Sequence, residues 1–423
     1  MILKNVSIQN FKGIRHLELE FHPGFNLIKG INGTGKTSIL EALAVGLGGF
    51  VSGVTGVSTR HFSQDEIRRQ FAISGDGACD EKYQLPVRVN LSADLSDGRS
   101  VVWTRERADI QGSRSTVNPR TISKIAEEMT NSKQQMLPLL CYHGTGRVWS
   151  QKRAKSATSA SSFRQRSVGY ADALQGTSNN KFLLDWCVKM EQVGWQKESK
   201  ITEYEAAKNA AAGFINIMEG KPETCVFYDK QMEELMFYGN GMVVPISCMS
   251  AGYQSLIWMV FDIASRMAIL NPFLMDRITD TPGVVLIDEL DMHLHPKWQW
   301  QVIDALRSTF PNLQFIATTH APILFSSARD VWLIDIDNDT VEYETSHYGL
   351  DVNASVTHYQ GAYDLPRQIK IDVDAFNDAM DEESYDTAKS ILDRLSETTA
   401  PEFPLIVELQ TRYGLETALR EIK

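Results

Sequence analysis

The chain has 423 residues, of which 43% are hydrophobic and 22% charged, and its formal net charge is −11. This length predicts one large domain with additions, or two domains, and the composition is typical of a globular protein that is not embedded in a membrane. The negative charge excludes a surface that is basic throughout, so any contact with nucleic acid is expected to be confined to a patch. Scattered cysteines and the lack of a long apolar run predict a cytoplasmic protein with reduced thiols.

The first residues predict strands followed by a phosphate-binding turn. Alternating apolar and polar residues over 2–21 indicate two strands joined around Asn10–Gly13, and Phe25–Lys29 reads as a buried strand. A helix is expected over Thr37–Val45, ending in the glycines at positions 46, 48 and 49. Further expected elements are a short helix over Gln64–Phe71, strands over Val87–Leu91 and Ser100–Arg107, a helix over Ile122–Met129 and a strand over Leu137–Tyr142.

Residues 30–37 have the spacing G-x-x-x-x-G-K-[ST] between an apolar strand and a helix. Glycines in such a turn let backbone N–H groups surround an anion, and the helix adds its positive N-terminal end. Lys36 can then reach the β- and γ-phosphates of a nucleotide, and the Thr37 hydroxyl can ligate Mg²⁺. The alternative is a chance glycine turn with an exposed lysine. The expected nucleotide-binding residues are Asn32, Gly33, Thr34, Gly35, Lys36, Thr37 and Ser38.

A basic, serine-rich segment without carboxylates follows the strand that ends at Tyr142. Its basic residues are Arg147, Lys152, Arg153, Lys155, Arg164 and Arg166. These side chains could contact nucleic-acid phosphates, and the alternative is a solvated loop. Helices are expected over Lys181–Val193 and Glu203–Met218, so that residues of about 146–220 form an insertion.

The second half of the chain alternates strands and helices, which is typical of an α/β fold. Strands are expected over Cys225–Tyr228, Glu234–Tyr238, Met242–Ile246, Gly283–Asp288, Gln314–Thr318, Val331–Ile336 and Thr340–Glu344. Helices are expected from Ser250 to Leu270 and over Pro296–Thr309. The division expected from this pattern is a domain over residues 1–345 and a helical region over 346–423.

Two strand ends carry candidate catalytic residues. The strand before Asp288 and Glu289 is wholly apolar, which favours a central parallel strand whose carboxyl end reaches a ligand. Asp288 could then hold Mg²⁺, and Glu289 could polarise the attacking water. His320 follows the next strand, at the same edge, and could contact the γ-phosphate. The alternatives are a solvated acidic turn and a structural histidine.

A fourth candidate lies at the start of the helix that runs to Leu270. Ser250 and Gly252 offer a hydroxyl and backbone N–H groups to an anion. An ordinary helix cap is the alternative.

The order of these four stretches resembles ABC-type ATPases of the SMC, RecF and recombination-repair branch. Asn10-Phe11-Lys12-Gly13-Ile14, followed by the glycine turn, is similar to the N-terminal signature of that branch. The resemblance implies an ABC-type ATPase fold, with a P-loop parallel sheet, an antiparallel β subdomain, a helical insertion and a C-terminal helical tail. It implies that Lys12 and Asp291 belong to the nucleotide site, that Ser250 and Gly252 cap the γ-phosphate bound to a second subunit, and that His320 is the switch histidine.

Within this branch, several segments resemble the ATPase subunits (PtuA) of Septu anti-phage systems and of related retrons. These segments are Tyr142–Arg147, Gly169–Trp186, Asp288–Trp298 and Tyr348–Asp351. The resemblance implies a homo-oligomeric ATPase that uses ATP and Mg²⁺ and controls a separate HNH nuclease. In retron versions, a reverse transcriptase and its DNA–RNA product complete the complex. The region 346–423 would make partner or oligomer contacts.

The chain departs from the family pattern at two places. Met249 and Ala251 replace the usual Leu and Gly around Ser250, a small change for a contact made by the backbone. The loop after Tyr142 occupies the place of the Q-loop but has no glutamine at once, because Gln134 and Gln135 precede it and Gln151 follows. That Mg²⁺ ligand is therefore unassigned.

The function that best fits these residues is ATP hydrolysis, and the resemblance implies that it controls a nuclease in anti-phage defence. One alternative is a DNA-repair or recombination ATPase that clamps DNA directly, without a nuclease partner. Another is a nucleotide-gated scaffold with almost no turnover. DNA-stimulated ATPase activity would favour the clamp, and a single-turnover measurement would identify the scaffold.

Overall fold

The structure is a computed structural model. It describes residues 1–31, 33–73, 79–112, 114–147, 163, 165–177, 179–220, 223–239, 241–337, 340–346, 348–350, 366–399 and 404–421. Predictions for Asn32, Lys152, Arg153, Lys155 and Arg164, and for the side chain of Arg147, lie outside the described part. The chain divides into two compact units, Met1–Leu350 and Asp351–Lys423, and each is described here by itself.

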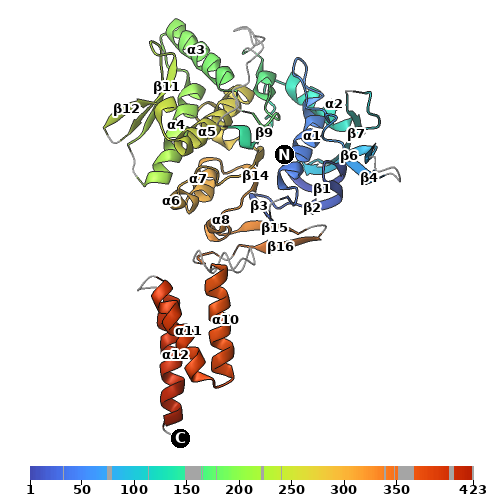
Figure 1. The fold of residues 1–423 in the computed structure, drawn as a ribbon. Helices are drawn as coiled ribbons and strands as arrows, with labels where there is room; N and C mark the ends of the chain where they lie inside the picture. Colours follow the sequence, from blue (N-terminus) through green and yellow to red (C-terminus); the bar gives the residue numbers. More distant parts are fainter. Residues whose placement is uncertain are drawn as a thin grey trace. The chain divides into compact units, whose positions relative to one another are not determined.

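A six-stranded sheet forms the centre of the first unit, with strand order β16-β15-β3-β14-β13-β9. Its strands are β3 (Phe25–Lys29), β9 (Leu139–His143), β13 (Gly283–Ile287), β14 (Leu313–Thr318), β15 (Val331–Asp337) and β16 (Thr340–Thr345). Only β15 and β16 pair in antiparallel fashion. The four strands β3, β9, β13 and β14 are buried along their whole length, as expected for parallel strands covered on both faces (Figure 1).

A second, antiparallel sheet has the order β2-β1-β6-β7-β8. Its strands are β1 (Ile2–Phe11), β2 (Ile14–Glu20), β6 (Val87–Asp94), β7 (Ser100–Arg107) and β8 (Thr116–Asn118). Alternate residues of β6 and β7 are buried, so one face of this sheet packs on the core.

The helix predicted over Gln64–Phe71 is wrong. The structure has strand β4 (Arg69–Ile73) there, paired with β5 (Cys79–Tyr83) so that Phe71 lies opposite Glu81. Strand formation depends on a partner that is distant in sequence, and local propensity does not report that partner.

Helix α1 (Lys36–Val51) packs between the two sheets and is longer than the sequence predicts. The prediction that it ends in the glycines at 46, 48 and 49 is wrong, because these residues serve close packing. A Cβ on Gly46 would lie 2.5 Å from Leu91 Cδ1, and one on Gly49 would lie 2.6 Å from Trp103 Nε1. The indole of Trp103 is fully buried and donates to the carbonyl oxygen of Gly46 at 2.8 Å.

A pair of glycine substitutions tests this packing. A Cβ on Gly53, just after α1, would lie 1.8 Å from the backbone oxygen of Ser123 in α2 (Thr121–Asn131), so we expect Gly53→Ala to lower the melting temperature. Gly213, inside α4 (Thr202–Glu219), has open space around its Cβ position, and Gly213→Ala should be neutral or stabilising by about 1 kcal/mol. Thermal unfolding measures the melting temperature of both variants. Equal melting temperatures would contradict the close packing of Gly53 against α2.

Among the remaining helices of the first unit, Ala251–Leu270 (α5) packs on β9 of the parallel sheet. Long helices α3 (Asn180–Lys197), α4 and α5 (Ala251–Leu270) lie beside a small antiparallel sheet of β10 (Cys225–Asp229), β11 (Glu234–Gly239) and β12 (Met242–Pro245). Shorter helices are α6 (Pro296–Gln299), α7 (Val302–Thr309), α8 (Pro322–Ser326), η1 (Thr145–Arg147), η3 (Arg166–Tyr170), η4 (Ile246–Cys248) and η5 (Pro272–Asp280). The single helix predicted over Pro296–Thr309 is therefore interrupted between Gln299 and Val302.

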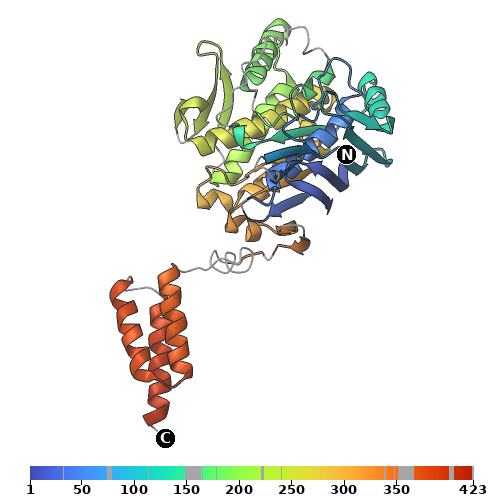
Figure 2. The same ribbon diagram turned by 45° about the vertical axis from the view of Figure 1, so that its right-hand side comes forward.

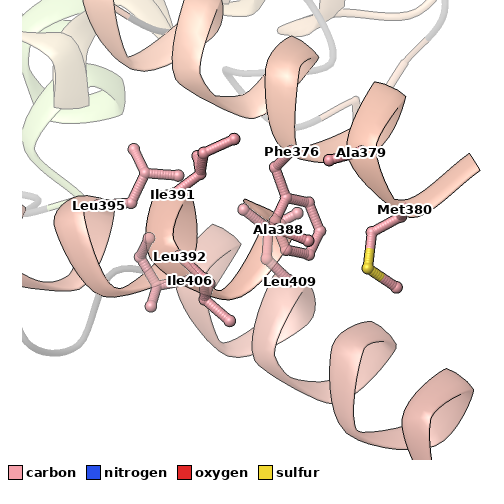
Figure 3. Packing of buried hydrophobic residues seen from close by; sticks show 9 residues of the cluster. All are labelled: Phe376, Ala379, Met380, Ala388, Ile391, Leu392, Leu395, Ile406 and Leu409. Atoms are coloured by element: carbon pink, nitrogen blue, oxygen red, sulfur yellow. The ribbon is translucent and has the colours of Figure 1, made fainter. Parts of the chain in front are cut away.

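The second unit contains α10 (Arg367–Asp381), α11 (Tyr385–Thr398) and α12 (Pro404–Glu421), as expected for a helical tail. Apolar residues at helical spacing meet in one small core, in which Phe376, Ala388 and Leu395 are fully buried (Figure 3). The other residues of this core are Ala379, Met380, Ile391, Leu392, Ile406 and Leu409. No helix in the described residues is long and apolar enough to cross a membrane.

Candidate functional site

The turn between β3 and α1 has the backbone of a phosphate cradle. Gly33 and Gly35 have φ angles of +92° and +90°, a region that residues with a Cβ rarely adopt. Lys36 folds back over the turn, where its Nζ donates to the carbonyl oxygens of Gly30 at 2.7 Å and Ile31 at 2.9 Å. The N–H groups of the first helical turn have no intrahelical partner, so an anion at this end of α1 would meet donors and a positive dipole end.

The charge of Lys36 is balanced by nearby carboxylates. Burial lowers the pKa of Lys36, while Asp288, Glu289 and Asp291 act in the opposite direction and favour its charged form. The fold therefore brings the predicted lysine and the predicted acidic residues into one site, although they are about 250 residues apart in sequence.

Asp288 lies directly after β13 and is only 1% exposed. Its Oδ1 accepts a hydrogen bond from Thr318 Oγ1 at 2.6 Å and one from Thr37 Oγ1 at 3.2 Å. Hydroxyl and carboxylate oxygens are the ligands that Mg²⁺ prefers in proteins. The Thr37 and Asp288 oxygens therefore fit a magnesium ion held between the phosphate cradle and β13.

Glu289 has a φ of +47°, which is uncommon for a residue with a side chain and marks a backbone held by its surroundings. Its N–H donates to Thr318 Oγ1 at 2.8 Å. One hydroxyl thus positions both acidic residues, since it accepts from the Glu289 backbone and donates to the Asp288 carboxylate. The sequence analysis missed Thr318; its signal is a hydroxyl residue at the last position of a strand that ends beside Asp288.

The loop after Glu289 is bonded to the segment that carries His320. Asp291 Oδ1 accepts from Thr319 Oγ1 at 2.5 Å and from the backbone N–H of His320 at 3.3 Å. The carboxyl end of β14 therefore places His320 at the same edge of the sheet as Asp288, as expected for adjacent parallel strands.

Lys12 lies at the turn between β1 and β2 and forms an ion pair with Glu41 of α1. Its backbone N–H donates to the carbonyl oxygen of Glu66 at 2.8 Å. The structure thus places Lys12 against helix α1 and assigns it a partner within the protein.

Ser250 and Gly252 lie at the start of α5. Ser250 is exposed, and its side chain makes no capping hydrogen bond to the helix. A Cβ on Gly252 would lie 2.5 Å from the backbone oxygen of His293, so only a glycine allows α5 to approach the loop after Asp291 this closely. In both views, the hairpin β11–β12 that leads into α5 lies on the side of the unit opposite α1 (Figures 1 and 2).

Comparison with known proteins identifies the class of this chain. Residues 5–220 match a family model described as an AAA domain, and residues 120–325 match one described as an AAA ATPase domain. The chain belongs to the AAA domain family. It is an ATPase, as the two models and the relatives below indicate.

Relatives of this AAA-domain chain include proteins of two named systems. It is 26% identical to the Retron Vc95 probable ATPase of Vibrio cholerae, over 77% of this chain and 71% of the relative. It is 23% identical to the Septu protein PtuA of Bacillus thuringiensis, over 81% of this chain and 78% of the relative. The resemblance to Septu and retron ATPases predicted from sequence is therefore confirmed.

The AAA-domain chain also matches ATPases of the SMC and RecF type. A stretch of 96 residues, or 22% of the chain, is 35% identical to the DNA replication and repair protein RecF of Vibrio vulnificus. The solved structure of an Smc head bound to the C-winged helix domain of ScpA aligns with 82% of this chain and 97% of that one, at 18% identity and a TM-score of 0.51. The predicted ABC-type fold is confirmed by this similarity.

Proposed function

We propose that this AAA-domain chain hydrolyses ATP at a site shared by two copies, and that the nucleotide state of the pair controls an HNH nuclease in an anti-phage defence complex. The observation that carries the proposal is the meeting of Lys36, Thr37 and Asp288 at one edge of the sheet. Its relatives in retron and Septu systems, matched over most of the chain, support the defence role.

The residues of this edge suit phosphoryl transfer, whose catalysis is mostly positioning and charge neutralisation. Lys36 and the backbone N–H groups from Asn32 to Ser38 would hold the β- and γ-phosphates, with Lys12 and Asp291 nearby. Thr37 and Asp288 would hold Mg²⁺, which would supply charge neutralisation on those phosphates. Glu289 would take a proton from the water that attacks the γ-phosphorus, while the bond to the ADP oxygen breaks. His320 would contact the γ-phosphate.

A second copy is proposed because the start of α5 does not serve its own cradle. Ser250 is exposed, and its side chain makes no capping hydrogen bond to α5. Helix α5 begins on the side of the unit opposite α1 (Figure 2). An exposed helix N-terminus with a free hydroxyl suits the γ-phosphate of ATP bound to another copy. ATP would then join two copies, and hydrolysis would release them.

An arginine at position 250 tests the shared site. We expect Ser250→Arg to keep ATP binding but to lose ATP-dependent pairing and to lower kcat about 100-fold or more, because the bulky side chain keeps the second copy from the phosphate. Light scattering and phosphate release measure the two effects. Ser199→Arg, at an exposed serine between α3 and α4, is the matched control. Normal turnover by a monomeric Ser250→Arg protein would refute the shared site.

The nuclease partner is tested by copurification. We expect an HNH protein encoded beside this chain to remain bound during purification, together with a reverse transcriptase and its DNA–RNA product if the system is a retron. The region 346–423 is the proposed contact, since its residues Asp351–Lys423 form a compact unit whose described helices share a core. Deleting this region should release the partner while ATP hydrolysis continues.

The second candidate is a clamp on DNA without a nuclease partner, favoured by the match to RecF. It predicts DNA-stimulated ATPase activity that is lost when Arg147, Lys152, Arg153 and Lys155 are neutralised together. Turnover of the isolated protein that is independent of DNA would argue against this candidate.

A further inference from the structure

A buried polar cluster joins the end of β9 to helix α5. Cys141 Sγ lies 3.5 Å from His143 Nε2, and His143 Nε2 lies 3.7 Å from Asp262 Oδ2. Cys141 and His143 are two residues apart on a strand, so their side chains share a face. Neither the sequence motifs nor the relatives assign a role to these residues.

Arg266 fixes Asp262 on the helix side of this cluster. Its Nε lies 2.9 Å from both carboxylate oxygens of Asp262, one turn away on α5. Its Nη1 donates to the carbonyl oxygens of Gly169 at 2.8 Å and Ala171 at 2.9 Å. Arg266 is 3% exposed, and a charge buried this deeply is stable only while these partners stay in place.

On the sheet side, the backbone of His143 is hydrogen-bonded to the backbone of the candidate metal ligand. The backbone N–H of Asp288 donates to the carbonyl oxygen of His143 at 2.8 Å. In the parallel pairing of β9 and β13, His143 lies opposite Ile287, the residue before Asp288. A shift of His143 would therefore move Asp288 against Thr37 and the phosphate cradle.

Helix α5 connects Ser250 to Asp262. Ser250 precedes its first residue, and Asp262 lies twelve positions further on, which is about 18 Å along a helix axis. Nearly every residue of α5 after its first turn is buried, so the helix transmits displacement as a rigid element. A displacement of Ser250 would thus be passed along α5 to Asp262, and from there to His143 and Asp288.

A metal ion is the competing interpretation of this cluster. The ligand atoms of Cys141, His143 and Asp262 lie within 4.8 Å of one another. Arg266, however, places a guanidinium against both oxygens of Asp262, and a divalent cation there would be repelled at short range in a buried site. The arginine already balances the carboxylate, which favours a polar connection without metal.

We propose that His143, Asp262 and Arg266 are positioning residues that couple helix α5 to Asp288, so that a second copy docking on Ser250 sets the geometry of the metal-binding carboxylate. This rests on the proposed two-copy site.

His143→Gln tests the coupling, because glutamine keeps a polar side chain of similar size without the imidazole. We expect kcat for ATP to fall about 10- to 100-fold, as for other residues that orient a metal ligand, while ATP affinity and ATP-dependent pairing stay within about twofold of the wild type. His61→Gln, at a half-buried histidine of the antiparallel β region, is the matched control and should leave all three quantities unchanged.

The double variant His143→Gln/Asp262→Asn shows whether the two residues act through one another or affect turnover independently. Residues that act through one another should lose no more turnover together than the worse single variant. Additive losses, a normal kcat in His143→Gln, or one equivalent of zinc in the wild type that His143→Gln loses would each overturn the proposal. Failure of the proposed two-copy site gives a different result, because two copies of the wild-type protein would then not associate when ATP is added.

Discussion

Glu289→Gln is expected to bind ATP with wild-type affinity and to lose turnover about 100- to 10,000-fold, the usual contribution of a general base. Glutamine has the size of glutamate and keeps the backbone, so the bond from the residue-289 N–H to Thr318 Oγ1 stays in place. It cannot accept a proton from the attacking water. Phosphate release under steady-state and single-turnover conditions measures the loss.

The same substitution should accumulate paired copies, because ATP stays intact between them. Light scattering with ATP is expected to show a dimer for Glu289→Gln at protein concentrations where the wild type is mainly monomeric. Glu127→Gln on the exposed face of α2 is the matched control, with normal turnover and pairing. Wild-type kcat in Glu289→Gln would refute the role of this carboxylate.

Lys36→Met is expected to weaken ATP binding about 10- to 100-fold, since one charge-assisted hydrogen bond to phosphate contributes about 1.5–3 kcal/mol. Hydrolysis at low ATP concentration should fall further, because the lysine also neutralises charge that develops on the phosphates. Titration calorimetry with ATP and Mg²⁺ measures the affinity. The matched control is Lys124→Met, at an exposed lysine of α2.

Folding distinguishes this loss from general damage. Burial lowers the pKa of Lys36 even though three nearby carboxylates act in the opposite direction, so its charged form is less stable here than in water. Removing the charge should therefore leave the melting temperature near that of the wild type. A large fall in melting temperature together with normal ATP binding would show that Lys36 is structural.

Local patterns predicted the elements that end at the site. The glycine spacing before Lys36, the apolar run before Asp288 and the strand before His320 each lie within about ten residues, where chain geometry decides the conformation. Thr37 and Asp288 were both expected to ligate one Mg²⁺, and Thr37 Oγ1 lies 3.2 Å from Asp288 Oδ1.

Other features depend on residues that are distant in sequence. The glycines near the end of α1 predicted the end of the helix from sequence. In the structure they allow α1 to contact Leu91 and Trp103, more than forty positions away. Arg69–Phe71 forms a strand because β5 pairs with it. Thr318, which holds both acidic residues, was visible only as the last residue of a strand.

The sequence by itself determined which residues are candidates to hold phosphate and metal, because that chemistry depends on residue type and short spacing. Only the tertiary structure decided what holds those residues in place: the hydroxyl of Thr318, the ion pair of Lys12 with Glu41, and the cluster of His143, Asp262 and Arg266. Such contacts form when packing brings separate elements together, and no pattern along one stretch of chain records which side chains will meet.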